Sequence, residues 1–208
     1  MMQKVVNNLP EEAKSVISVP KTIQFKNDAA RSCEEKTSEL KEKMTESGLK
    51  WPCICKALAG ARAKNSHLHG VVNTDEGMNQ ILASETYHDC DIVLQEYAHH
   101  QEKLYKLYVC GSNFATKIRR SLPDSVIFAS DVHNFNNAVP FDKESYQKFN
   151  EVDELHHAKI DMFVRQFTKD FNMNLYGLDV IVETRTGRHV VLDMNYFPGY
   201  LEIDEAEM

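Results

Sequence analysis

The spacing of apolar residues along the chain changes between two periods, and each period predicts one kind of element. Runs rich in β-branched and aromatic residues, either apolar throughout or alternating with polar residues, predict short strands. These runs cover residues 22–25, 51–56, 69–72, 92–97, 104–110, 114–119, 175–182 and 189–194. Strands are therefore expected along most of the chain.

Helical spacing of apolar residues occurs between these strands. A stripe through 29–47 ends at Gly48, which predicts a helix with a glycine C-cap. A short helix is expected over 75–83, and 151–171 is the longest helix candidate. The remaining segments predict irregular structure: residues 1–18, apart from a short helix start at Pro10, and residues 57–66 and 123–140.

Two turn sequences join neighbouring strands. Gly111-Ser112-Asn113 separates 104–110 from 114–119, and Thr186-Gly187 separates the last two strands, so each pair is expected to form an antiparallel hairpin. Hairpins mixed with helices in this way favour an α+β fold over a doubly wound parallel sheet. The sequence has no glycine-rich phosphate loop of either common type.

Composition narrows the class of protein. The chain has 208 residues, 42% of them hydrophobic and 26% charged, which is typical of a folded chain with one large domain or two small ones. Its formal net charge of −7 argues against a general nucleic-acid or membrane-surface binder. No apolar stretch approaches the roughly 20 residues that span a bilayer, so membrane insertion is not expected.

The five cysteines and the N-terminal segment bear on the cellular compartment. An odd cysteine count without framework spacing, behind an N-terminus that does not resemble a signal peptide, predicts reduced thiols in a cytoplasmic protein. Cys53 and Cys55 lie on one face of a predicted strand. Burial in the core is the favoured interpretation of this pair, and a metal clip is the alternative.

Two carboxylates interrupt apolar strands near the C-terminus. Asp179 and Asp193 each lie in a β-rich run where an uncompensated charge is costly, and Asn195 shares a strand face with Asp193. If the two strands pair across Thr186-Gly187, the carboxylate oxygens of both aspartates and the amide oxygen of Asn195 converge. Oxygen ligands of this kind suit Mg²⁺ together with substrate phosphates. The alternative is that both aspartates only end strands or cap turns.

Lys56 and His67 flank a loop that follows a predicted buried strand. A lysine that ends such a strand can reach a phosphate group, although a lysine whose ammonium simply extends to solvent is the alternative. A single loop histidine such as His67 is more often structural or solvated than functional. His99-His100 lacks a third metal ligand at a recognisable spacing.

A second group of cations belongs to the hairpin over 104–119. Lys106 interrupts a strand otherwise suited to burial, so it needs an anionic partner or a route to solvent. Lys117, Arg119 and Arg120 form a basic cluster on the partner strand. This cluster suits phosphate neutralisation, and a charge-protected edge strand is the alternative.

An ordered set of motifs resembles the inositol-tetrakisphosphate 1-kinase family, the inositol 1,3,4-trisphosphate 5/6-kinases, which have the ATP-grasp fold. The resemblance extends from about Val19 to Tyr200, and its last motif makes the ordered set specific. The motifs are Trp51-Pro52-Cys53-Ile54-Cys55-Lys56, Asn65-Ser66-His67, Gln95-Glu96-Tyr97 through Leu104-Tyr105-Lys106, Arg119-Arg120-Ser121-Leu122-Pro123-Asp124, Gly177-Leu178-Asp179, and Asp193-Met194-Asn195-Tyr196-Phe197-Pro198-Gly199-Tyr200.

The resemblance implies an α+β ATP-grasp fold of two subdomains with ATP held between them. It also implies Mg²⁺-dependent transfer of the γ-phosphoryl group to a hydroxyl of an inositol polyphosphate. By this resemblance Lys56 would contact an ATP phosphate, and Gln95 to Ala98 would form a hinge that holds the adenine largely through backbone groups. The implied nucleotide-binding residues are Lys56, Gln95, Glu96, Tyr97, Ala98, Lys106 and Ser121.

The same resemblance implies the metal and substrate residues. Asp179, Asp193 and Asn195 would ligate Mg²⁺. The implied substrate-binding residues are His67, Lys106, Asn195 and Gly199, and the implied catalytic residues are Lys106, His67 and Arg119.

Several features depart from the family pattern. The resemblance divides the chain into an N-terminal extension over 1–18, a central subdomain over 19–96 and a truncated C-terminal subdomain over 97–208. It thereby implies that the family's N-terminal domain and final C-terminal helix are lacking. Gln101-Glu102-Lys103 also replaces a small or apolar turn beside the hinge.

Three functions fit these observations. The first is an ATP-dependent inositol polyphosphate kinase. The second is a truncated relative that binds ATP or inositol phosphate without turnover. The third is an ATP-grasp ligase that joins a carboxylate to an amine, because one fold hosts several chemistries. A turnover assay with and without Asp193 separates the first two, and amine-dependent release of ADP would identify the third.

Overall fold

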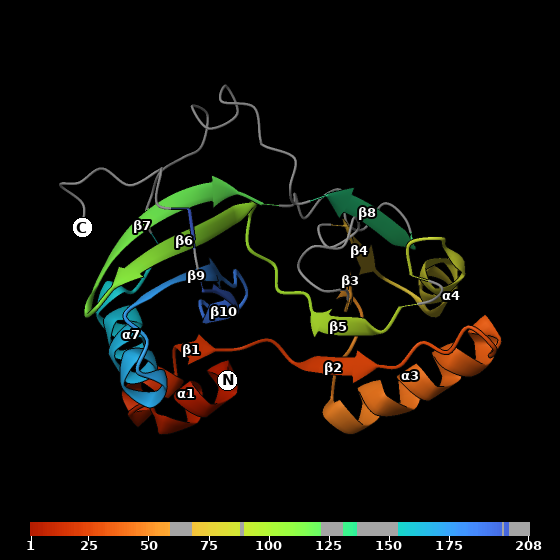
Figure 1. Cartoon of the computed structure of the whole chain (residues 1–208), viewed down its shortest axis with the longest axis horizontal. Coiled ribbons are helices and arrows are strands. Elements are labelled where there is room, and N and C mark those ends of the chain that lie inside the picture. Colours follow the sequence, from red (N-terminus) through yellow and green to blue (C-terminus); the bar gives the residue numbers. More distant parts are fainter. Residues whose placement is uncertain (59–67, 88–89, 122–130, 137–153, 197, 200–208) are drawn as a thin grey trace. The chain divides into compact units, whose positions relative to one another are not determined.

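The computed structural model describes residues 1–58, 68–87, 90–121, 131–136, 154–196 and 198–199. Figure 1 labels its strands and all its described helices except α2. The chain forms two compact units, each with a five-stranded sheet. Unit 1 comprises Met1–Val19, Ala98–Ser121 and Asp142–Met208, and unit 2 comprises Pro20–Tyr97 and Leu122–Phe141. Helices packed on largely antiparallel sheets confirm the predicted α+β class.

Two hairpins form most of the sheet of unit 1. Its strand order is β1, β10, β9, β6, β7, and the hairpin strands are β6 (Lys103–Cys110), β7 (Asn113–Arg120), β9 (Leu175–Val182) and β10 (His189–Asn195). Gly111 has a φ of 62° in the first turn and Gly187 has a φ of 69° in the second. Both are left-handed conformations that glycine adopts without steric cost. Both predicted hairpins are confirmed.

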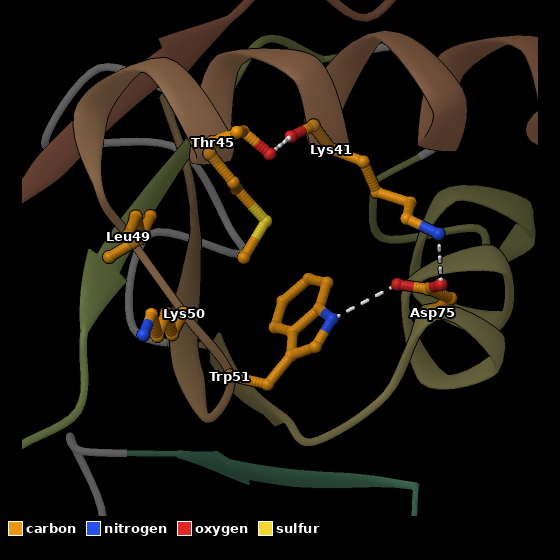
Figure 2. A pocket seen from close by; sticks show the side chains of 7 residues that line it. Lys41, Thr45, Leu49, Lys50, Trp51 and Asp75 are labelled. Carbon is orange, nitrogen blue, oxygen red and sulfur yellow. Dashed lines mark hydrogen bonds and ion pairs between the residues drawn. The ribbon is translucent and has the colours of Figure 1, made fainter.

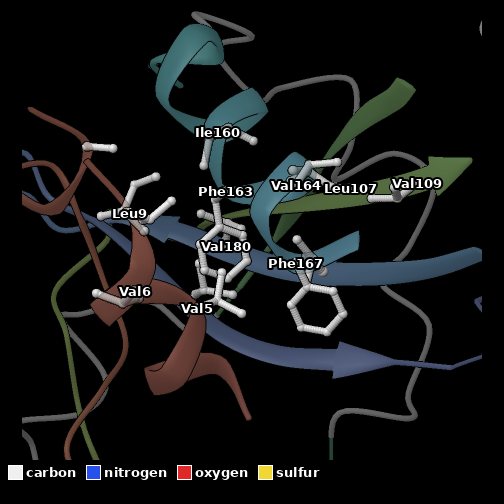
Figure 3. Close-up of a cluster of buried hydrophobic side chains, with 14 of the residues drawn as sticks. Val5, Val6, Leu9, Leu107, Val109, Ile160, Phe163, Val164, Phe167 and Val180 are labelled. Carbon is white, nitrogen blue, oxygen red and sulfur yellow. The ribbon is translucent and has the colours of Figure 1, made fainter. Parts of the chain in front are cut away.

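One face of this sheet packs on α7 (His157–Phe171), as Figure 3 shows. Phe163 and Phe167 are fully buried on the helix and belong to one apolar cluster with alternate residues of β6 and β9. The Phe167 and Tyr176 ring centroids lie 4.7 Å apart. The predicted apolar helix face is therefore the core of unit 1.

The α7 helix begins later than the sequence predicts. Residues 151–153 lie outside the described residues, and 154–156 are not helical. The Lys103 ammonium lies 2.6 Å from a Glu154 carboxylate oxygen, and the His156 N–H donates to His189 Nε2 at 2.7 Å. These tertiary contacts hold the chain outside the helix until His157.

The segment expected to be a polar extension belongs to unit 1. It forms α1 (Met2–Asn8), α2 (Glu11–Lys14) and β1 (Ile17–Ser18), and β1 pairs in parallel with β10. Its buried side chains join the core around α7: Val5, Val6, Leu9, Ala13 and Ile17. The observed units therefore differ from the linear division at residues 18 and 96, because this segment contributes both a strand and core side chains to unit 1.

The sheet of unit 2 has the strand order β2, β5, β3, β4, β8. Its elements are β2 (Thr22–Phe25), α3 (Cys33–Ser47), β3 (Cys53–Ala57), β4 (Leu68–Val72), α4 (Asp75–Ala83), β5 (Ile92–Glu96) and β8 (Val132–Asn136). The α3 helix begins at Cys33 because Ser32 and Glu35 form a capping box, and Gly48 ends it with a φ of 65°. The predicted α4 bounds are confirmed.

The β8 strand lies inside a segment that the sequence predicts to be irregular. It pairs antiparallel with β4, from Val132 opposite Val72 to Asn136 opposite Leu68. Residues 123–130 and 137–140 of this segment lie outside the described residues, as do residues 59–66 of the other predicted irregular segment. An edge strand has one strand neighbour, so its sequence pattern is weak.

The paired cysteines lie in the core of unit 2. Cys53 and Cys55 are fully buried among apolar residues, and all five cysteines of the chain are free thiols. Desolvation, with a smaller effect of the Glu96 charge, raises the pKa of the Cys53 thiol to about 12. The burial favoured by the sequence is confirmed, and both thiols are protonated at neutral pH.

Candidate functional site

Four strands of unit 1 each place one charged residue in the same row of the sheet. Asp193 on β10 is opposite Asp179 on β9, which is opposite Lys106 on β6, which is opposite Lys117 on β7. Residues paired across strands point to the same side of a sheet. The row lies on the face opposite the core, because the neighbouring residues Tyr105 and Leu107 are buried in that core.

A β-bulge puts Asp193 in this row. Val191 pairs with Val180, and the next pair joins Asp193 with Asp179, so Leu192 is an extra residue on β10. Without it, the alternation of strand residues would turn Asp193 toward the core. The bulge therefore brings the two predicted metal carboxylates to one face.

Asn195 continues the same face of β10 and pairs with Gly177 of β9. A Cβ atom on Gly177 would lie 3.0 Å from Pro198 Cβ, so the missing side chain makes room for the segment after β10. Gly199 follows in this segment and is exposed. Gly177 belongs to the Gly177-Leu178-Asp179 motif, and its role in the structure is to leave room for Pro198.

The donor atoms of Asp179, Asp193 and Asn195 are carboxylate and amide oxygens on one sheet face. Asp179 is half-buried with a buried Oδ1 atom, and Asp193 is exposed. Such a set matches Mg²⁺, which keeps several waters and uses few protein carboxylates. Within the described residues, no cluster of three or more His, Cys, Asp and Glu side chains is placed to hold a metal ion.

Two further cations extend the face on β7. Lys117 is half-buried, and Arg119 donates from Nη2 to the Tyr108 hydroxyl at 3.4 Å. Arg119 lies opposite Leu104 and shares the strand face of Lys117. Arg120 points to the other side and pairs with Glu102 at 3.0 Å. The predicted basic cluster therefore divides, and Lys117 and Arg119 share the face of Lys106.

Unit 2 contains the predicted phosphate-contacting lysine. Lys56 lies near the end of β3, is half-buried and donates from Nζ to Gln95 Oε1 at 2.7 Å. Its strand neighbours are Val93 and His69, on the sheet face opposite the core. The structure thus brings together two of the implied nucleotide-binding residues within unit 2.

The predicted hinge over residues 95–98 contains two backbone N–H groups that donate within unit 2. The Glu96 N–H bonds to the Lys21 carbonyl at 2.8 Å, and the Tyr97 N–H bonds to the Pro52 carbonyl at 3.2 Å. These two groups are therefore not donors to a ligand in this conformation. The next residue, Ala98, belongs to unit 1.

Ser121 follows the last residue of β7 in unit 1. Its hydroxyl lies 2.7 Å from Nε2 of the buried His100, and its N–H donates to the Glu102 carbonyl at 2.6 Å. The sequence assigned His100 no role, since only the folded chain brings it to Ser121. The remaining predicted residue, His67, lies outside the described residues.

Unit 2 has a pocket of about 220 Å³, and none of the predicted site residues lines it. Figure 2 shows its polar groups contacting one another. Asp75 accepts from Trp51 Nε1 at 3.0 Å and from Lys41 Nζ at 2.6 Å, and both donors lower the pKa of that carboxyl. These contacts connect α3, α4 and the start of β3, so we interpret them as structural.

Comparison with known proteins identifies the family. The model of the "Inositol 1,3,4-trisphosphate 5/6-kinase ATP-grasp domain" family matches residues 12–208. An inositol-tetrakisphosphate 1-kinase from Xenopus laevis is 29% identical over 83% of this chain and 43% of that protein. Inositol-tetrakisphosphate 1-kinase 1 from Arabidopsis thaliana is 29% identical over 76% of this chain and 52% of that protein. The chain spans about half the length of these relatives.

Solved structures with the same fold are more distant in sequence. The macrocyclase MdnC from Microcystis aeruginosa has a TM-score of 0.57 at 16% identity, covering 100% of this chain and 55% of that one. A RiPP-associated ATP-grasp ligase from Chryseobacterium gregarium has a TM-score of 0.56 at 13% identity, with coverages of 98% and 58%. Within the described residues, no helix is long and apolar enough to cross a membrane. By its match to the family model, the chain belongs to the inositol 1,3,4-trisphosphate 5/6-kinase ATP-grasp domain family.

Proposed function

We propose that the protein transfers the γ-phosphoryl group of ATP, with Mg²⁺, to a hydroxyl group of an inositol polyphosphate. The row of Asp193, Asp179, Lys106 and Lys117 is the observation that supports this most strongly. It combines oxygen ligands for a cation with ammonium groups for phosphates on one sheet face. Phosphoryl transfer depends mainly on such positioning and charge stabilisation.

The charged and polar residues on this sheet face would have distinct roles. Asp179, Asp193 and Asn195 would hold Mg²⁺, which when bound neutralises charge on the β- and γ-phosphates. Lys106 lies opposite Asp179 in the pairing of β6 with β9. Its positive charge would stabilise the transferring phosphoryl group. We infer the same supporting role for Arg119.

The remaining assignments follow the family resemblance. Lys56 would bind an ATP phosphate, and its contact with Gln95 orients the ammonium before the nucleotide arrives. The other proposed nucleotide-binding residues are Gln95, Glu96, Tyr97, Ala98, Lys106 and Ser121. The proposed substrate-binding residues are His67, Lys106, Asn195 and Gly199, with His67 also among the proposed catalytic residues.

The experiment is a turnover assay on the purified 208-residue chain with Mg-ATP and a panel of inositol tris- and tetrakisphosphates. We expect ADP in equal amount to a more highly phosphorylated inositol phosphate. Asp193→Asn should lower the turnover rate by about 100-fold or more, as loss of one charge-stabilising group commonly does. Asp161→Asn, which changes a half-buried carboxylate on α7 that pairs with Arg165, is the matched control and should retain wild-type activity.

Other outcomes separate the alternatives. Calorimetric ATP binding without product would support a relative that binds but does not turn over. ADP release that requires an added amine would indicate a ligase. Wild-type activity in Asp193→Asn would contradict the proposed metal site.

A further inference from the structure

Lys117 is the outermost charge of the row on the sheet face of unit 1. It is half-buried and lies on β7, the last strand in the described order of this sheet. Lys106 is directly opposite on β6, so the Cβ atoms of two lysines lie about 5 Å apart. On its other side Lys106 is opposite an acidic residue, Asp179. Positive charge therefore accumulates at the β7 end of the row.

Arg119 adds a third positive charge at the same place. In the register of the hairpin, Arg119 lies two residues from Lys117 on one side of the lysine pair. Tyr108 lies two residues from Lys106 on the other side of that pair. Arg119 Nη2 is nevertheless 3.4 Å from the hydroxyl of Tyr108, a residue that is only 2% exposed. The two side chains therefore meet across the lysine pair, and the guanidinium lies over the row that holds both lysines.

The carboxylates proposed to hold the metal lie at the other end of the row. Neighbouring strands are about 4.8 Å apart, so across the sheet Lys117 is about 10 Å from Asp179 and about 14 Å from Asp193. Under the proposed function, the β- and γ-phosphates of ATP lie with Mg²⁺ at the aspartate end, and Lys106 faces the transferring group. An anion beside Lys117 is one strand farther from the metal, and this distance separates it from the reacting phosphate.

We propose that Lys117 is a specificity-determining residue that binds a phosphate already present on the inositol polyphosphate, and not a phosphate of ATP. This rests on the proposed function, in which the sheet face receives the acceptor. A hydrogen bond from an ammonium to a phosphate is charge-assisted, and the charges of Lys106 and Arg119 raise the positive potential around it. The site therefore selects inositol phosphates with a phosphate facing Lys117 over those with a hydroxyl group in that position.

The first test measures binding without turnover. Calorimetry with Mg²⁺ gives the dissociation constants of ATP and of a parent ligand, each measured alone so that no phosphoryl transfer occurs. The parent ligand is the inositol tris- or tetrakisphosphate that the wild-type chain binds most tightly. Lys117→Met should bind it about 10-fold more weakly or worse, the value of one hydrogen bond to a charged group, and should bind ATP like the wild type. Lys117→Arg keeps the charge and should retain most of the affinity.

The second test identifies the phosphate that Lys117 contacts. The ligands are the inositol phosphates that each lack one phosphate of the parent ligand. The wild-type chain should bind the one without the contacted phosphate about 10-fold more weakly than the parent, whereas Lys117→Met should bind these two ligands equally. If Lys117→Met weakens the parent and every such ligand by the same factor, Lys117 acts only through the general field, and the proposed contact is overturned.

Steady-state kinetics separates this role from a structural or catalytic one. Lys117→Met should raise the KM for the inositol phosphate and leave kcat and the KM for ATP near their wild-type values, because the contacted phosphate does not react. Lys169→Met, which removes one exposed positive charge on α7, is the control for net charge and should change none of the three constants. Thermal unfolding of each variant monitors the fold. A fall in kcat alone would overturn the proposed role.

The results distinguish failure of this inference from failure of the proposed function. Lys117-dependent binding of the parent ligand by a chain that forms no product would refute the proposed function and support the phosphate site. Product formation with an unchanged affinity for the parent ligand in Lys117→Met would refute only the inference. An equal loss of affinity for ATP and for the parent ligand would also refute it, since Lys117 would then not distinguish the acceptor. A wild-type chain that binds no inositol phosphate would refute both.

Discussion

The candidate residues of unit 1 are positioned by the backbone, whereas those of unit 2 depend on a side-chain contact. In unit 1, four adjacent strands each place one charged residue in the row from Asp193 to Lys117, and strand register aligns them. In unit 2, Lys56 is oriented by a hydrogen bond to Gln95. A ligand phosphate can replace that side-chain bond, but it cannot change the register of a sheet.

Under the proposed function, this difference would assign separate tasks to the two units. A preorganised row of charges suits stabilisation of a transition state, because its groups need no reorganisation during the reaction. A lysine that exchanges Gln95 for a phosphate suits binding of ATP in its ground state. Substitutions in unit 1 should therefore act on turnover, and those at Lys56 on affinity.

Core substitutions provide the largest expected effect and test whether the units are separate. Phe163→Ala in unit 1 should lower the free energy of unfolding by about 3–5 kcal/mol, and Leu40→Ala in unit 2 by about 2–5 kcal/mol, since both side chains are fully buried. Hydrogen exchange measured by mass spectrometry should show lost protection mainly within the substituted unit. An equal loss of protection in both units would contradict independent cores. As a control, Phe163→Leu should lower the free energy of unfolding less than Phe163→Ala.

Lysine substitutions sharpen the functional comparison. Lys106→Met should lower kcat by about 10²- to 10³-fold, because it would remove the positive charge proposed to stabilise the transition state. Lys56→Met should mainly raise the KM for ATP. Steady-state kinetics on both variants measures kcat and the KM for ATP separately. Lys169→Met, which changes an exposed residue on α7, is the control. The comparison fails if both lysines change kcat and KM in the same proportion.

Acid unfolding tests the Asp75 contacts of unit 2. Hydrogen bonds from Lys41 and Trp51 lower the pKa of Asp75 below its usual value of 3.8 in the folded chain. The carboxylate therefore stabilises the fold above that value, and the contribution is lost as the pH falls through the lower folded pKa. Because Asp75 and Lys41 are about half exposed, Asp75→Asn should cost no more than about 1 kcal/mol at pH 7.

The difference between Asp75→Asn and the wild type should shrink below pH 4, as measured by urea unfolding at a series of pH values. A constant difference across that range would show that the contact does not depend on the charge of Asp75. Glu76→Gln, which lies next to it in the first turn of α4, is the control for helix effects.

The turn beside His100 gives the smallest expected effect. Gln101 has a φ of 49°, and glycine at this position should stabilise unit 1 by roughly 0.5–1 kcal/mol through relief of left-handed backbone strain. Gln101→Ala should give no such gain. Chemical unfolding of the three proteins measures this difference, and a loss of stability in Gln101→Gly would show that the side chain contributes more than the strain costs.

Local sequence determined the elements whose signals lie within a few residues. The glycine turns at Gly111 and Gly187, the capped end of α3 and the bounds of α4 all follow from nearby residues. The same local patterns identified Asp179, Asp193 and Lys106 as charges inside strands. The family resemblance supplied their proposed roles, which neither spacing nor composition specifies.

Local sequence patterns did not predict the elements that depend on partners far along the chain. The β8 strand depends on its pairing with β4, and β1 depends on β10, some 170 residues away in sequence. The buried stripe of Val5, Leu9 and Ala13 recurs every four residues, and that spacing is a signal that could have revealed the N-terminal helices.

The sequence by itself determined which residues carry charge and which local elements hold them. Only the tertiary structure decided which charges meet. The extra residue Leu192 brings Asp193 into register with Asp179, and the end of the β6–β7 hairpin brings His100 to Ser121. The physical reason is that strand pairing and bulges depend on partners far along the chain, which local periodicity does not specify.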